Sequence, residues 1–181
     1  MNAGINHEGF AALLALKEGE EERVRQTLRA LPQGERSPFA QLSGTHFARL
    51  TLVPPLRDRN DRPAPGLPFC LFFAAEFDML PGGYLESLCT RVPGRAEEMF
   101  GRCIGFPGTG APAPFVSWMF EHRVRAGFSA HGYPGAIAAE VERCLELRDR
   151  IIAFALDTRN LAPEALRERW AQQEWGLDGT R

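Results

Sequence analysis

The chain has 181 residues, a formal net charge of −2 and a pI near 6.1, with 44% apolar and 24% charged residues. This composition is typical of one folded domain with a sizeable core. It argues against a nucleic-acid-binding surface, which needs clustered positive charge. No apolar run approaches the roughly 20 residues that span a bilayer. The opening MNAGINHEGF lacks a basic region followed by an apolar one, so we expect no secretion signal, no membrane contact and a cytoplasmic location.

The four cysteines are dispersed along the chain, as Cys70, Cys89, Cys103 and Cys144. They form no CxxC motif, and no histidine lies at the spacing of a zinc site. The sequence therefore predicts free thiols and no metal site.

The first half of the sequence predicts a strand, a helix and two further strands. FAALLAL at 10–16 alternates as a strand does, and the spacing of apolar residues becomes helical over 17–31. The strand-like alternation of side chains returns in THFARLTLV at 45–53 and predicts the second strand. A proline-rich stretch at 54–68 predicts a loop. FCLFFAAEF at 69–77 then predicts the third strand.

The second half predicts two helices and one more strand. Residues 82–103 have helical spacing with a break at Pro93-Gly94, which predicts a kinked helix. A Gly/Pro-rich connection and a short helical or irregular piece, WMFEHRVR, lead to GFSAHGY at 127–133, a candidate strand. A long amphipathic helix is predicted over 137–152, and the C-terminal tail begins at 157.

The order β-α-β-β-α-β is that of the ferredoxin-like α+β fold, an antiparallel sheet with its helices on one face. We expect a single domain with its core at 9–156 and a tail at 157–181. The other face of such a sheet carries Phe, Leu and Val without cover. A two-fold symmetric second copy would bury both sheets at once, so a homodimer is expected.

Several segments resemble the dimeric α+β barrel superfamily. GFAALLALKEGEEERVRQTLRALP is similar to its first strand and helix. THFARLTLV, FFAAEFDMLPGGYLESL and SAHGYPG resemble an uncharacterised bacterial group in that superfamily, related to dye-decolorising-type peroxidases. The resemblance covers residues 9–156. It implies haem peroxidation, haem or chlorite chemistry, cofactor-free oxygenation of aromatic compounds, or no catalysis.

The peroxidase branch of that superfamily carries a Gly-x-x-Asp-Gly turn with its acid beside haem. In AAEFDMLPGG the resemblance aligns Asp78 with this acid, while the first glycine is absent and Met79 replaces the last one. Haem is therefore the cofactor that the resemblance would imply if the chain is a peroxidase.

The third strand has two different faces. Alternation places Cys70, Phe72, Ala74, Glu76 and Asp78 on one of them. The opposite face is more apolar and is assigned to the helices. Glu76 and Asp78 then lie at a polar rim, which Arg49 of the second strand and His131 or Tyr133 of the fourth would join.

These polar residues allow a functional and a structural interpretation. In the functional one, Asp78, His131 and Arg49 are catalytic, Glu76 and Tyr133 bind a ligand, and a desolvated carboxylate exchanges protons near neutral pH. In the structural one, Arg49 and Glu76 form a cross-strand ion pair and Asp78 caps the following turn or helix. His46 is expected to be a strand-end histidine with a backbone partner.

Two functions therefore remain open. The first is a small oxidoreductase or peroxidase-related enzyme that acts on a small molecule in a pocket beside the sheet. The second is a non-catalytic module that binds a small ligand or a partner protein.

Overall fold

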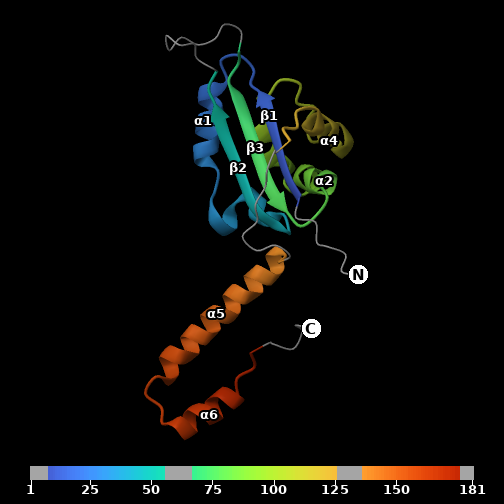
Figure 1. Cartoon of the computed structure of the whole chain (residues 1–181). Coiled ribbons are helices and arrows are strands. Elements are labelled where there is room, and N and C mark those ends of the chain that lie inside the picture. Colours follow the sequence, from blue (N-terminus) through green and yellow to red (C-terminus); the bar gives the residue numbers. More distant parts are fainter. Residues whose placement is uncertain (1–7, 56–66, 126–135, 176–181) are drawn as a thin grey trace. The chain divides into compact units, whose positions relative to one another are not determined.

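A computed structural model describes residues 8–55, 67–125 and 136–175 of the protein. Its regular elements are β1 Glu8–Ala15, α1 Glu21–Ala30, η1 Gly34–Arg36, η2 Pro38–Gln41, β2 Thr45–Val53, β3 Cys70–Phe77, α2 Pro81–Arg91, α3 Pro93–Phe100, α4 Pro112–Glu121, α5 Ala138–Thr158 and α6 Pro163–Ala171. The chain divides into two compact units, Met1–Ala138 and Ala139–Arg181 (Figure 1).

The strands of the first unit form an antiparallel sheet in the order β1-β3-β2, with β3 at the centre (Figure 1). Phe73 of β3 lies opposite Ala12 of β1 and Leu50 of β2. The three predicted strands and the mixed α/β class are confirmed. The candidate strand at 127–133 lies outside the described residues.

The helices of the first unit pack on one face of this sheet. Phe73 is fully buried at the centre of the packing, and its ring centroid lies 5.6 Å from that of Phe100, 6.1 Å from Phe39 and 6.3 Å from Phe10. The helices contribute further large buried side chains: Val24, Tyr84, Leu85, Leu88, Met99, Phe115, Trp118 and Met119. The apolar face of the third strand therefore packs against the helices, as its alternation predicts.

The predicted kinked helix is two helices, α2 and α3, which meet at Val92. Pro93 has no N–H to continue α2, and its fixed φ suits the first turn of a new helix. Val92 lies outside helical geometry, with φ −130° and ψ 49°. The break predicted at Pro93-Gly94 is confirmed.

The outer edge of β1 is bonded to two later segments. Leu13 N–H donates to the His122 carbonyl at 3.0 Å, and Val124 N–H donates to the Ala11 carbonyl at 2.8 Å. Farther along the strand, Ile104 N–H donates to the Ala15 carbonyl at 2.8 Å. The residues around 104 and 122–124 therefore protect this edge from pairing with other chains.

The second unit contains the helical hairpin of α5 and α6. The Phe154 ring lies 5.4 Å from Trp170 and 5.3 Å from Trp175, and the side chains of Asp157 and Arg169 are 3.6 Å apart. The predicted helix at 137–152 extends to Thr158, and a second helix forms where only a tail is predicted. Neither α5 nor any other helix of the described ranges has the apolar length that crossing a bilayer requires.

Burial of a tyrosine and a cysteine predicts a loss of stability in alkali. Burial raises the pKa of Tyr84 from 10.0 to about 12 and that of Cys103 from 9.0 to about 12. Both groups are neutral when protonated, and burial disfavours their ionised forms. Their burial therefore contributes fully to the free energy of unfolding below about pH 9, and this contribution is lost as pH rises through 12. At about 1.4 kcal/mol per pKa unit, we expect the free energy of unfolding to fall by several kcal/mol between pH 9 and 12.

Urea unfolding at a series of pH values measures this loss. Tyr84→Phe and Cys103→Ala should each flatten the decline, because each removes a group that ionises more readily in the unfolded chain. A free energy of unfolding that stays constant to pH 11 would contradict the assignment of both groups to the core.

Candidate functional site

The sheet face opposite the helices carries the first group of candidate residues. We call it the open face, and its side chains are Gly9, Ala11, Leu13 and Ala15 of β1, Cys70, Phe72, Ala74 and Glu76 of β3, and Phe47, Arg49, Thr51 and Val53 of β2. Leu13 is 40% exposed and Phe47 is 49% exposed, which is unusual for large apolar residues on a sheet. Phe72 is half-buried between the two outer strands. This face therefore combines an apolar centre with charged positions near one end.

Glu76 and Arg49 lie on the open face, as the alternation predicts. Glu76 is directly opposite Phe47, and Arg49 is directly opposite Ala74, so the two charged residues are diagonal neighbours. The ion pairs that form between described residues do not include one from Arg49 to Glu76. The predicted cross-strand ion pair between Arg49 and Glu76 therefore does not form among the described residues, and the two stand on a diagonal of the ladder.

Asp78 lies just after β3 and is bound to two distant parts of the chain. One carboxylate oxygen, Oδ1, contacts Nε2 of His46. The other, Oδ2, accepts a hydrogen bond from the N–H of Ala138 at 2.8 Å. The Asp78 side chain is 13% exposed and that of His46 is 24% exposed. Both carboxylate oxygens thus have partners in a largely buried position.

The turn before β2 also fits closely around Asp78. Gly44 has a φ of 78°, and its carbonyl accepts the Asp78 N–H at 3.0 Å. A Cβ at position 44 would lie 3.3 Å from the Asp78 Cβ, so a side chain there would be both strained and crowded. The Asp78 side chain therefore caps α5 through the N–H of its first residue, Ala138. It does not cap α2, the next helix in the sequence, whose N-cap residue Leu80 makes no side-chain bond.

His46 is the residue that the sequence interpretation missed. It was expected to bond the backbone, and its Nε2 contacts the Asp78 carboxylate. The ladder between β2 and β3 shifts register between Thr45 and Phe47, and such a bulge re-aims the side chain of the extra residue. The sequence carries no local signal of this bulge. His131 and Tyr133 lie in 126–135, outside the described residues, so their predicted roles stay predictions.

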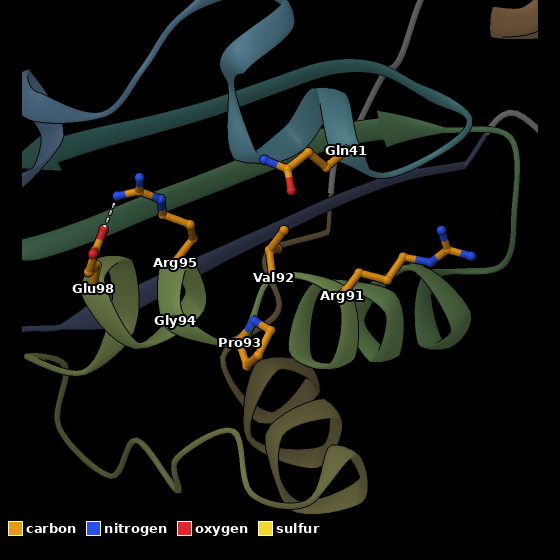
Figure 2. A pocket seen from close by; sticks show the side chains of 7 residues that line it. All are labelled: Gln41, Arg91, Val92, Pro93, Gly94, Arg95 and Glu98. Atoms are coloured by element: carbon orange, nitrogen blue, oxygen red, sulfur yellow. Dashed lines mark hydrogen bonds and ion pairs between the residues drawn. The ribbon is translucent and has the colours of Figure 1, made fainter.

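Neither of two pockets found among the described residues of the first unit is lined by a candidate residue. One, of about 330 Å³, lies at the junction of α2 and α3 (Figure 2). Its Arg95 turns to Glu98, with the two side chains bonded at 2.6 Å, while Arg91 extends in the other direction. The second, of about 310 Å³, is lined by Leu28, Leu31, Pro32, Gln33, Gly34, Ser37, Pro38, Phe39, Ala48 and Leu50.

The first pocket is weakly suited to a charged ligand. The C-terminus of α2 and the N-terminus of α3 meet there, so opposite ends of two helix dipoles offset each other. Arg91 and Arg95 are both exposed to solvent. The open face is therefore the better candidate site.

The residue that the resemblance places beside haem already has partners within the chain. Asp78, which the resemblance aligns with the peroxidase acid, has one oxygen on His46 and the other on the Ala138 N–H. Within the ranges that the structure describes, no three metal-ligating side chains gather in one place. Comparisons with protein-family models, curated proteins and solved structures find no match for this chain.

Proposed function

We propose that the protein is a homodimeric ferredoxin-like α+β module that binds a small, largely apolar molecule at the open face of its sheet. The observation that carries the proposal is the exposure of two large apolar side chains on this face: Leu13, directly opposite the half-buried Phe72, and Phe47, opposite Glu76. Removing such side chains from water contributes about 25 cal/mol per Å² of apolar area, so a second copy and a ligand would both gain from covering this face.

The topology supports the ferredoxin-like part of the proposal. The order β1-β3-β2, with α1 after β1 and α2 after β3, matches the first five elements of that fold. The fourth strand would pair with the outer edge of β1. An antiparallel bridge from Ala12 to Arg123 lies on that edge, only a few residues before the candidate strand at 127–133.

The charged residues of the open face would select the ligand. Arg49 is exposed and offers a fork of N–H donors that suits a carboxylate. The neighbouring apolar side chains suit a ring or a short hydrocarbon chain. A small aromatic carboxylate therefore fits the face better than a sugar or a nucleotide, and Glu76 would disfavour a second anionic group.

A small oxidoreductase is the second candidate, and the contact between His46 and Asp78 favours it. A carboxylate that holds a histidine ring fixes its tautomer, and such pairs move protons in many enzymes. In this candidate the pair would accept a proton from the substrate and dioxygen would be the oxidant, as in the cofactor-free oxygenation of aromatic compounds that the resemblance implies. A Soret absorption band in the purified protein would instead support the peroxidase-related function.

A fluorescence titration with 2-naphthoate tests the ligand-binding proposal. We expect saturable binding that Arg49→Gln weakens about tenfold, which corresponds to about 1.4 kcal/mol for a lost charged hydrogen bond. Arg95→Gln is the matched control, because it removes an exposed arginine from the pocket at α2 and α3. Unsaturable binding, or an equal loss in both variants, would contradict the proposal.

A further inference from the structure

The outer edge of β2 differs from the outer edge of β1, which later segments of the chain protect. Residues 47–53 of β2 pair with β3 on one side, and no described residue bonds their backbone on the other side. The second unit contributes no strand among its described residues, and the backbone groups of α5 and α6 bond within each helix. An extended segment is therefore the partner that can supply the N–H and C=O groups missing at this edge.

The side of β2 that faces the helices is also incompletely covered. Its apolar side chains Ala48, Leu50 and Leu52 are only half-buried, whereas the helix-facing apolar side chains of β1 and β3 are at most 2% exposed. The second pocket, of about 310 Å³, lies beside this half-buried row, and both of its strand residues, Ala48 and Leu50, belong to β2. The packing over β2 therefore leaves room for an apolar side chain from outside the sheet.

Two arginines that adjoin the pocket lining in the sequence favour an acidic partner. Arg29 follows Leu28 and Arg36 precedes Ser37, and both arginines are exposed. The ion pairs formed between described residues include neither of them. A guanidinium group binds a carboxylate through paired N–H donors, so these side chains suit a segment that contains Asp or Glu.

We propose that the outer edge of β2 binds an acidic, extended segment of a partner protein, which adds a strand to the sheet and places an apolar side chain in the pocket beside Ala48 and Leu50. The backbone of the added strand would pair with residues 47–53, and every second side chain would face the pocket. A second copy of β2 is disfavoured, because residues 23–49 contain five arginines and one acid, and a two-fold pair would bring two such stretches together.

Selection from a random peptide library displayed on phage, with the full-length chain as bait, tests the inference. We expect the selected peptides to carry apolar residues at alternate positions over about six residues, the usual length of a strand, and to be rich in Asp and Glu. The inference does not depend on the proposed function, because the open face takes no part in this contact. A selection that enriches no such pattern would overturn the inference.

Filling the pocket tests where the most enriched peptide binds. Ala48→Phe should weaken its binding about tenfold or more in a fluorescence anisotropy titration, because the new ring occupies the space of the peptide side chain. Ala40→Phe is the matched control and should leave the affinity unchanged, because Ala40 is exposed in η2 and does not line the pocket. A dimer that Ala48→Phe dissociates would assign the edge to a second copy and would overturn the inference.

A charge reversal keeps the test sharp if Ala48→Phe does not fold. Arg29→Glu with Arg36→Glu should weaken peptide binding about tenfold or more, since both positions would then repel an acidic segment. Arg91→Glu with Arg95→Glu is the control, because it reverses two exposed arginines beside the other pocket. A folded Ala48→Phe or Arg29→Glu/Arg36→Glu variant that binds the peptide as tightly as the wild type would overturn the inference.

Discussion

Replacing Phe73 by alanine is expected to lower the free energy of unfolding by about 3–5 kcal/mol. Phe73 is fully buried at the centre of β3, and its ring contacts Phe10, Phe39 and Phe100. Those neighbours come from β1, η2 and α3, which cannot all move to fill the space. Urea denaturation at neutral pH measures the loss.

Phe72→Ala is the matched control for this experiment. Phe72 is the same residue type one position earlier, and it lies half-buried on the open face. We expect this variant to lose less than about 1.5 kcal/mol when both variants are unfolded below the concentration of dimerisation, because the Phe72 side chain is partly exposed within one copy. Equal losses at the two positions would mean that the assignment of the two sheet faces is wrong.

Asp78→Ala is expected to cost about 2–4 kcal/mol of unfolding free energy. The substitution removes the acceptor shared by the part-buried Ala138 N–H and the His46 ring, and the Asp78 side chain that supplies it is only 13% exposed. A double-mutant cycle with His46→Ala should give a coupling energy of about 1–3 kcal/mol, since the two side chains are in contact. Additive losses would show that their contact contributes nothing to stability.

The same position separates the structural from the catalytic interpretation. Asp78→Asn keeps one acceptor oxygen, so a structural residue should lose part of its stability and leave 2-naphthoate binding unchanged. Loss of ligand binding or turnover with an unchanged melting temperature would instead restore the catalytic role that the resemblance implies.

The sheet and its buried face were predictable because they rest on local patterns. FCLFFAAEF alternates with a period of two, and only one of its faces is rich in large apolar residues. Pro93 marks a helix break for a covalent reason, its missing N–H. The positions of Glu76 and Arg49 on one face follow from the same alternation, whereas the residue that stands opposite each of them depends on the register between strands.

The surroundings of Asp78 depend on contacts that no local pattern encodes. His46 is 32 residues away and Ala138 is 60 residues away. His46 reaches the carboxylate through the register shift in β2, and the Ala138 N–H reaches it from the start of α5. No periodicity of the sequence contains that information, so the Asp78 cap was expected on the wrong helix.

Helix α6 was missed for a related reason. Its nine residues are too short to show a clear stripe, and a helix of this length is marginal alone. Pro163 at the first turn is a valid start signal. The contacts of Trp170 and Trp175 with Phe154 stabilise it, and these join residues far apart in the sequence.

The central claim is that the open face of the sheet associates with a second copy. Sedimentation equilibrium of the wild type and of Leu13→Gln with Phe47→Gln tests it most directly, because both side chains are exposed on that face. We predict a wild-type dimer of twice 20.1 kDa at micromolar concentration and a tenfold or larger rise in the dissociation constant of the variant. A well-folded wild-type monomer of 20.1 kDa, or a dimer that the two substitutions leave intact, would contradict the claim.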